Sequence, residues 1–378
     1  MNYLSSYAVV VPSLHPVRKH FLPFLEELVR KSPGAVVVID DGSGEEYRPI
    51  FAQAESLGCI VLTHPENKGK GRALKTGLRH CVDQLPHLSG VITADSDGQH
   101  AVDDIERVAA ELDRLAGAGT PAVVLGSRTF DAADVPPRSR MGNTMTTSVI
   151  KALFGRRVSD TQTGLRGLPL GVAARAVDIK GEKFDYEMNQ LIWLITIRHQ
   201  VVEVPIRTIY HDTDNSISHF RPIRDSLWIY FLILRQFLVF IGVSAASAII
   251  DLAAYYVLID FVFGPGRTTA HVAVAVALAR VLSSVVNFVL NRTVVFHDPS
   301  AAVPAARRYY LLAVVIMIAS SAGTAVLSVL SGGHDMWAKI VCDVVLFCAS
   351  YAAQQRWVFA KTPPAATAAR PAVSMRRR

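Results

Sequence analysis

The sequence is short of charged residues. Of its 378 residues, 19% are Asp, Glu, Lys or Arg, whereas 51% are hydrophobic. Soluble domains usually carry about 25% charged residues. This composition excludes a disordered chain. Because the long apolar runs all lie beyond about residue 222, it indicates a soluble part followed by a membrane part.

Cysteine is scarce as well. The chain has four cysteines: Cys59, Cys81, Cys342 and Cys348. No two of them form a CxxC pair, which argues against a zinc site or a disulfide framework, so we expect reduced thiols. A secretory signal peptide is not apparent either, since Met1–Leu4 leads directly into the strand-like Ala8–Val11. We therefore expect the first domain to stay in the cytoplasm.

Acidic residues are outnumbered by basic ones, 32 to 39, which gives a net charge of +7. A basic chain suits anionic lipid, phosphorylated substrates or nucleic acid. The basic residues cluster beside the apolar runs. We therefore expect the membrane and phosphorylated substrates as partners, and no nucleic acid.

The first 120 residues alternate between strand and helix patterns. Strands are expected at residues 8–11, 35–39, 59–62, 90–93 and 122–125, and helices at 21–29 and 71–82. Such alternation predicts an α/β domain with a mainly parallel, doubly wound sheet. Ligands of these sheets bind at the carboxyl ends of the strands.

Charged side chains follow three of these strands. Asp40 and Asp41 follow the second strand, Asp95 and Asp97 the fourth, and Arg128 the fifth. Two carboxylates one residue apart can jointly hold a hard divalent ion, Mg²⁺ or Mn²⁺, which usually bridges to substrate phosphates. The alternative is a solvated acidic turn. The preceding apolar strand and the second acidic strand end favour the metal.

Six motifs occur in a fixed order. They are Val9-Val10-Val11-Pro12, Val38-Ile39-Asp40-Asp41-Gly42-Ser43, Asn67-Lys68-Gly69-Lys70-Gly71, Asp95-Ser96-Asp97-Gly98-Gln99-His100, Gly126-Ser127-Arg128 and Asp160-Thr161-Gln162-Thr163-Gly164-Leu165-Arg166. With them, residues 5–230 resemble the family-2 glycosyltransferases of the GT-A fold, and more narrowly the dolichyl- and polyprenyl-phosphate sugar synthases.

The resemblance implies a nucleotide-diphosphate sugar as donor, a polyprenyl phosphate as acceptor and Mg²⁺ or Mn²⁺ as cofactor. The donor would be bound by Pro12, Ser13, Asp40, Asp41, Lys70, Gly71 and Asp95. The metal would be held by Asp95, Asp97 and Gln99. The acceptor phosphate would be received by Arg138, Arg140 and His211. The catalytic residues would be Asp97, Arg128 and Asp160, with Asp160 as an acid–base or positioning group.

Four apolar segments make up the second half of the chain. They lie at roughly Phe237–Phe263, Ala270–Leu290, Tyr309–Leu330 and Trp337–Phe359. A helix of about 20 residues spans a hydrocarbon core of about 30 Å, so each segment is long enough to cross a membrane. This region resembles the small GtrA-like membrane domain. Asp251, Arg280 and Asp343 lie inside these segments, and we expect Arg280 to pair with one of the two aspartates.

The expected domain organisation has four parts. Residues 1–210 form a GT-A glycosyltransferase domain, 211–234 interfacial linker helices, 235–362 a GtrA-like four-helix transmembrane domain, and 363–378 a basic disordered tail. A homo-oligomer is compatible with this organisation.

The expected function is an inverting, metal-dependent transfer of a hexose, of the glucosyl or mannosyl type. The hexose passes from a nucleotide sugar to an undecaprenyl-type phosphate at the cytoplasmic membrane face, and the lipid-linked sugar serves cell-envelope glycan assembly or modification. One alternative is a processive polysaccharide synthase. Such enzymes carry a QxxRW motif, which this chain lacks because Ala353, and not a glutamine, stands three residues before Arg356. The other is a lipid-linked-sugar transporter or scaffold with a degenerate transferase domain, against which the intact Asp95, Asp97 and Gln99 argue.

The arginines predict the topology of the membrane part. They gather before the first segment, between the second and third, and after the fourth. By the positive-inside rule, the catalytic domain and both termini face the cytoplasm. A reporter fused after Arg378 should therefore be cytoplasmic and one inserted at Gly264–Thr268 external. Activities of paired phosphatase and β-galactosidase fusions check this, and the reverse pattern would refute the orientation.

Overall fold

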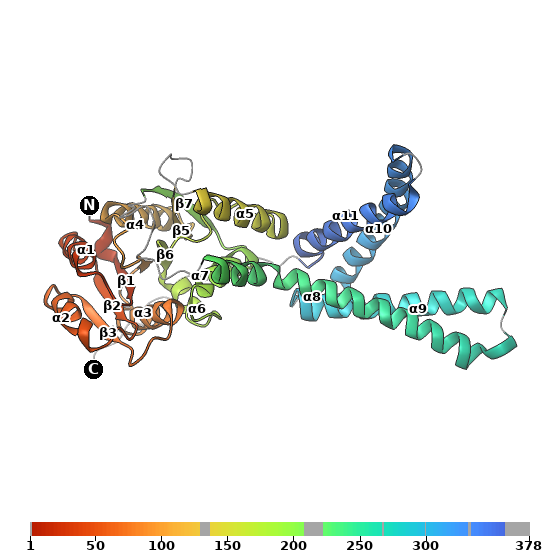
Figure 1. Cartoon of the computed structure of the whole chain (residues 1–378), viewed down its shortest axis with the longest axis horizontal. Coiled ribbons are helices and arrows are strands. Elements are labelled where there is room, and N and C mark those ends of the chain that lie inside the picture. Colours follow the sequence, from red (N-terminus) through yellow and green to blue (C-terminus); the bar gives the residue numbers. More distant parts are fainter. Residues whose placement is uncertain are drawn as a thin grey trace, which may run out of the picture. The chain divides into compact units, whose positions relative to one another are not determined.

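The protein's structure is a computed structural model. It describes residues 2–128, 137–207, 222–266, 268–298, 300–331 and 334–359. These residues fall into two compact units, which divide between residues 232 and 233, with residues 151–155 grouped in the second unit. Each unit is described here by itself, and Figure 1 labels their elements.

The first unit is built on a seven-stranded sheet. Its strands are β1 (Tyr7–Ser13), β2 (Ala35–Asp40), β3 (Ile60–Thr63), β4 (Gly90–Thr93), β5 (Val123–Arg128), β6 (Arg166–Pro169) and β7 (Val201–Ile206). Their order across the sheet is β3-β2-β1-β4-β6-β5-β7, and β6 alone runs antiparallel to its neighbours. The prediction of a mainly parallel α/β sheet is confirmed. All five expected strands are present, and β6 and β7 are additional.

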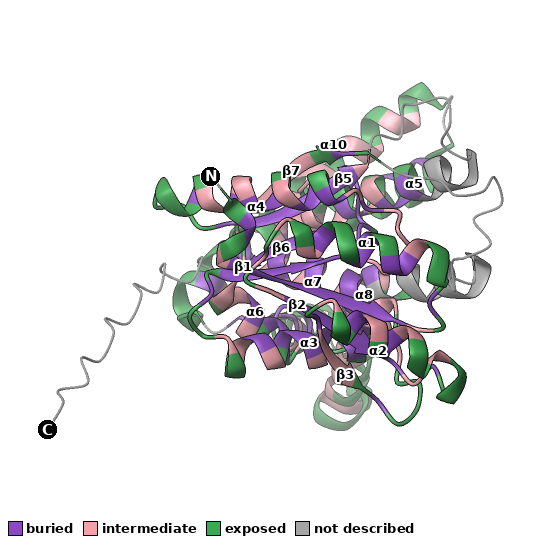
Figure 2. Ribbon diagram, turned by 90° about the vertical axis from the view of Figure 1, so that its left-hand side faces the viewer, coloured by how far each residue is buried: buried purple, intermediate pink, exposed green. Residues whose placement is uncertain are grey.

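Helices cover both faces of this sheet. They are α1 (Arg18–Arg30), α2 (Arg48–Ser56), α3 (Lys70–Gln84), α4 (Val102–Gly117), α5 (Pro137–Phe154), α6 (Leu170–Ala176) and α7 (Asp185–Thr196). Successive residues of a strand point to opposite faces. Val9 and Val11 join the core cluster that contains α1 and α4, whereas Val10 faces α3 at Gly77. Both faces of β1 are thus buried, as its purple ribbon shows in Figure 2, which explains its continuous apolar sequence.

One edge of the sheet gathers the polar strand ends. β1, β2, β4 and β5 are parallel to one another, so their carboxyl ends meet at this edge. β6 runs the other way and begins there, at Arg166. The pairing of Thr93 with Arg166 brings the segment before β6 beside the end of β4. The fold therefore joins two motifs that lie about seventy residues apart in the sequence.

Long apolar helices make up the second unit, and the first of them begins before residue 233, within the first unit. They are α8 (Pro222–Val257), α9 (Thr269–Leu290), α10 (Ala302–Leu330) and α11 (Asp335–Ala353). Together with short π-helical turns at three of their ends, four helices are long and apolar enough to cross a membrane, which confirms the expected segments. α8 starts at Pro222, so residues 222–234 of the expected linker continue without a break into the first span. The expected tail at 363–378 lies outside the described residues.

Several charged side chains within these helices are paired. Arg280 Nη2 lies 3.4 Å from Asp251 Oδ2, and Ser283 donates to Asp251 at 2.9 Å, which confirms the expected arginine–aspartate pair. In the other hairpin, Asp343 accepts from Lys339 at 2.7 Å and from Ser320 at 2.8 Å. Pairing of this kind lowers the cost of charge inside a membrane.

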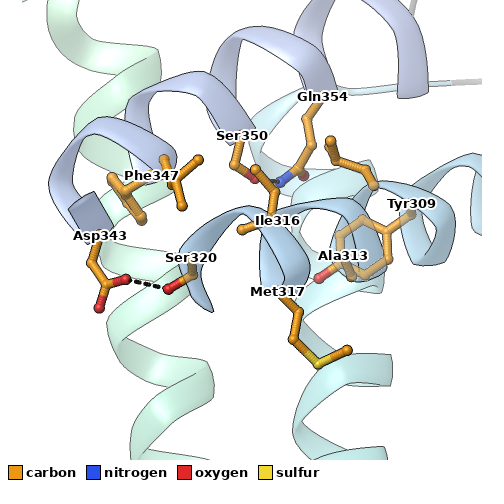
Figure 3. A pocket seen from close by; sticks show the side chains of 11 residues that line it. Tyr309, Ala313, Ile316, Met317, Ser320, Asp343, Phe347, Ser350 and Gln354 are labelled. Atoms are coloured by element: carbon orange, nitrogen blue, oxygen red, sulfur yellow. Dashed lines mark hydrogen bonds between the residues drawn. The ribbon is translucent and has the colours of Figure 1, made fainter. Parts of the chain in front are cut away.

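A cavity of about 430 Å³ lies between α10 and α11. Figure 3 shows the Ser320–Asp343 hydrogen bond among its lining side chains, with Ser350 and Gln354 further along α11 and its end. Most of the other lining residues are apolar.

The packing of α3 on the sheet depends on Gly77. A Cβ atom there would lie 2.5 Å from Val10 Cγ1 and 2.8 Å from Ile39 Cδ1. We therefore expect Gly77→Ala to lower the free energy of unfolding by about 1–3 kcal/mol through overpacking.

Gly117→Ala is the matched control, because a Cβ at Gly117, the last residue of α4, would meet nothing within 4 Å. Thermal unfolding of the two variants and the parent in detergent checks the prediction. Equal apparent midpoints for the two variants would contradict it.

Candidate active site

The ends of β1 and β2 form one side of the candidate site. Ser13 and Asp40 are buried and lie opposite each other in the strand pairing. Asp40 Oδ1 accepts from the amide of Ser43 at 2.8 Å, which fixes the turn after β2. Ser13 Oγ is buried, and no described residue bonds to it. A hydroxyl without a partner at a strand end is available to a ligand.

Asp41 holds the basic loop at residues 67–70. Its Oδ1 accepts from the amide of Lys68 at 3.1 Å and its Oδ2 from that of Gly69 at 2.8 Å. His64 Nδ1 lies 2.7 Å from Asp41 Oδ1, and His64 Nε2 lies 2.9 Å from Thr76 Oγ1. Asp41 is thus engaged in positioning the loop. The sequence analysis gave no role to His64, because a single histidine after a short strand carries no signal.

The loop places Lys70 against the end of β4. Lys70 Nζ lies 2.7 Å from Asp95 Oδ1 and 3.1 Å from Glu187 Oε2. Asp95 Oδ2 lies 3.3 Å from His100 Nε2. Gly71 follows Lys70 and lies against α7, where a Cβ atom would come within 2.5 Å of Tyr186 Cβ. The sequence placed Lys70, Gly71 and Asp95 in one site, and the structure brings them together.

The two carboxylates after β4 have opposite electrostatic environments. Burial opposes the charged form of Asp95, but the Lys70 ammonium and the His100 ring outweigh it and lower the pKa of Asp95 well below its usual range. Burial, followed by the charge of Asp95, raises the pKa of Asp97. Asp97 Oδ1 accepts from the amide of Gln99 at 3.0 Å. Asp95 is therefore firmly ionised, whereas Asp97 is the carboxylate that gains most from an additional positive charge.

A divalent ion fits this donor set. In the described parts of the chain, no three His, Cys, Asp or Glu side chains form a closed metal site. Asp95, Asp97 and Gln99 lie in one turn and carry oxygen atoms of the kind that Mg²⁺ prefers; so few protein ligands would leave coordination positions for substrate phosphates. The ammonium of Lys70 on Asp95 shows that the site already attracts a cation.

Arg128 and Asp160 form a second pair at the same edge. The guanidinium donates from Nε to Asp160 Oδ2 at 2.6 Å and from Nη2 to Oδ1 at 3.0 Å. Asp160 is fully buried, whereas Arg128 keeps a quarter of its side chain exposed. The bidentate contact fixes the orientation of the guanidinium. It therefore positions Arg128.

Two further charged residues support the site. Arg166 is buried beneath it and donates to the Thr163 and Glu187 carbonyls and to Gln190. The Oε1 atom of Glu187 is buried and accepts from no residue that the structure describes. The sequence motifs included Arg166 without a role and did not single out Glu187, because its importance depends on how α7 packs.

The expected acceptor-phosphate residues fall largely outside the part of the chain that the structure describes. The backbone of Arg138 and Arg140 lies in the first turn of α5. Their side chains, like His211 as a whole, lie outside the described residues. Their roles remain predictions.

Two family models match the chain. Residues 9–166 match the family described as glycosyl transferase family 2, and residues 239–359 match the transmembrane domain of GtrA/DPMS. This chain is a family-2 glycosyltransferase with a GtrA/DPMS transmembrane domain. Both resemblances noted in the sequence, to the family-2 glycosyltransferases and to the GtrA-like membrane domain, are therefore confirmed. The α/β unit of the enzyme is a GT-A-like domain.

The glycosyltransferase part of the chain is similar to proteins of Methanocaldococcus jannaschii, Methanococcus voltae and Trichomonas vaginalis. An uncharacterised protein of Methanocaldococcus jannaschii is 31% identical over 60% of this chain and 90% of its own length. A UDP-N-acetylglucosamine–dolichyl-phosphate N-acetylglucosaminyltransferase of Methanococcus voltae is 26% identical over 46% of this chain and 74% of its own. A dolichyl-phosphate β-glucosyltransferase of Trichomonas vaginalis is 28% identical over 41% of this chain and 48% of its own length.

Among solved structures, glucosyl-3-phosphoglycerate synthase from Mycobacterium tuberculosis aligns with 16% identity and a TM-score of 0.46. The alignment covers 61% of this chain and 79% of that one.

The role of Asp41 can be tested by removing it. Asp41→Ala leaves the half-buried amides of Lys68 and Gly69 without their Asp41 acceptor, a loss of about 1 kcal/mol each. We expect faster hydrogen–deuterium exchange at residues 67–70 and weaker binding of nucleotide. Glu66→Ala, which removes an exposed acid beside the loop, should leave both unchanged. Unaltered exchange in Asp41→Ala would contradict the positioning role.

Proposed function

We propose that the enzyme transfers a hexose from a nucleotide-diphosphate sugar to a polyprenyl phosphate at the cytoplasmic face of the membrane. The sugar is of the glucosyl or mannosyl type, the acceptor of the undecaprenyl type, and the transfer inverts the anomeric centre. The product is a lipid-linked sugar for cell-envelope glycans. The Methanococcus and Trichomonas relatives are both named as transferases to dolichyl phosphate, which is a polyprenyl-type phosphate. Their names therefore support this class of acceptor.

The observation that carries the proposal is the carboxyl edge of the sheet. Asp95 and Asp97 stand beside Lys70, and the Arg128–Asp160 pair lies at the end of the next parallel strand. Acidic oxygens for a cation and cationic groups for phosphates are what a diphosphate donor and a phosphate acceptor require. The same chain carries four helices long and apolar enough to span a membrane, which suits an acceptor with a lipid tail.

The nucleophile of the proposed reaction needs little activation. A phosphate monoester has a second pKa of about 6, so its oxygens are largely ionised at neutral pH. An in-line attack of one oxygen on the anomeric carbon forms the new glycosidic bond and releases the nucleoside diphosphate. Asp160 is not needed as a base, since both of its oxygens are paired with Arg128. We assign it the positioning role.

The larger task is to bring three phosphates together, the two of the donor diphosphate and the one of the acceptor. Arg128 is held with its guanidinium oriented and partly exposed, and it contacts the phosphates. Arg138 and Arg140, with His211, receive the acceptor phosphate. Asp95, Asp97 and Gln99 would hold Mg²⁺ or Mn²⁺, which would supply positive charge for the leaving diphosphate.

The direct test is transfer in membranes. Membranes that contain the enzyme are incubated with one radiolabelled nucleotide sugar at a time and with undecaprenyl phosphate. One donor should give a lipid-extractable, mild-acid-labile product. A polymer that grows on the enzyme would instead support a processive synthase, and no product from any hexose donor would refute the proposal.

The metal assignment predicts the effect of one substitution. Asp97→Ala should lower the rate of transfer by about 100-fold or more, because it removes electrostatic stabilisation of the leaving group. EDTA should do the same to the parent. Asp178→Ala, which removes an exposed carboxylate elsewhere in the unit, should leave the rate unchanged. Full activity of the parent in saturating EDTA would exclude the metal.

A further inference from the structure

Lys70 supplies a positive charge to the acidic end of β4. Its Nζ lies 2.7 Å from Asp95 Oδ1 and 3.1 Å from Glu187 Oε2, and only 20% of its side chain is exposed. The ring of Phe184 lies 5.9 Å away, close enough for a cation–π contact. Lysine side chains usually extend into water. Lys70 is instead folded back onto two carboxylates as an internal counter-cation.

A divalent ion and this ammonium compete for Asp95. Oδ1 is the oxygen in contact with Lys70, and Oδ2 lies 3.3 Å from His100 Nε2. Both oxygens of the carboxylate therefore already face a nitrogen. A doubly charged ion on Asp95 would stand within a few ångströms of the Lys70 ammonium, where like charges repel strongly. Full coordination by Asp95 requires that Lys70 move or that new negative charge arrive.

A nucleoside diphosphate brings that negative charge. Lysine is a compact point charge on a flexible stem and a common ligand of phosphate. Lys70 is also the first residue of α3, at a helix end that favours anions. The backbone around it is fixed, since Asp41 holds the amides of Lys68 and Gly69. The side chain can thus exchange partners while its Cα stays in place.

We propose that Lys70 makes binding of the divalent ion conditional on the nucleotide. In the free enzyme its ammonium neutralises Asp95 and Glu187. When the donor binds, the ammonium passes to the diphosphate and releases Asp95 to the ion. This inference rests on the proposed metal-dependent function and gives Lys70 a second role besides contact with phosphate.

Binding of Mn²⁺ to the full-length protein in detergent provides the test. The free ion is measured by electron paramagnetic resonance, with Mn²⁺ alone, with UDP and with GDP. In the parent, one of the two nucleotides should tighten Mn²⁺ binding at least about tenfold. In Lys70→Met, Mn²⁺ alone should bind at least about tenfold more tightly than in the parent, and the gain from nucleotide should shrink.

Lys68→Met is the matched control. It removes the same charge from the same loop, but its side chain is exposed, so its Mn²⁺ binding should match that of the parent. Lys70→Gln provides a second variant, because its amide can still donate to a carboxylate after the charge has been removed. Retained unfolding midpoints show that the variants fold.

The outcomes separate the two proposals. If Mn²⁺ alone binds the parent as tightly as Mn²⁺ with nucleotide, the inference is refuted without any variant. It is also refuted if Lys70→Met or Lys70→Gln folds but binds Mn²⁺ no more tightly than the parent. If the parent binds no Mn²⁺ under any condition, the metal assignment of the proposed function falls and the inference falls with it.

Discussion

Placing two carboxylates one residue apart in a partly buried turn is costly unless positive charge stands beside them. Asp95 and Asp97 meet this constraint through Lys70, whose Nζ lies 2.7 Å from Asp95. Much of the surrounding architecture serves that contact. Asp41 fixes the loop that carries Lys70, and Glu187 on α7 provides its second anionic partner. The site is therefore a balanced set of charges, in which a change to one partner alters the affinity of the others for ligands.

A balanced site of this kind suits a reaction between anions. Both the donor and the acceptor of the proposed transfer carry phosphate, and the phosphate oxygen is already a nucleophile at neutral pH. The protein must then supply position and compensating charge rather than a strong base. The buried contact between Asp160 and Arg128 fits this requirement, because it orients a cation and leaves part of it exposed.

The sequence predicted the parts of the fold that have a local signal. Continuous apolar runs such as Val9–Val11 identified the buried parallel strands, and long apolar segments identified the membrane helices. The motifs located Asp95, Asp97 and Arg128. The sequence did not reveal β6, whose four residues include a buried arginine and a glycine. Nor did it reveal His64 or Glu187, because each acquires its role from a contact with a distant residue.

The reversed strand β6 has a consequence for how the enzyme folds. β4 and β5 have no direct ladder, because β6 lies between them and pairs with both. The segment before β6 also touches the acidic turn, where a Cβ on Gly164 would lie 2.4 Å from Asp95 Oδ2. During synthesis, β1 to β4 can therefore pair as soon as they emerge, whereas the acidic edge must wait for residues far along the chain. Contacts of such long sequence separation form slowly, so the catalytic edge is completed late, close to the time when the first membrane helix is made.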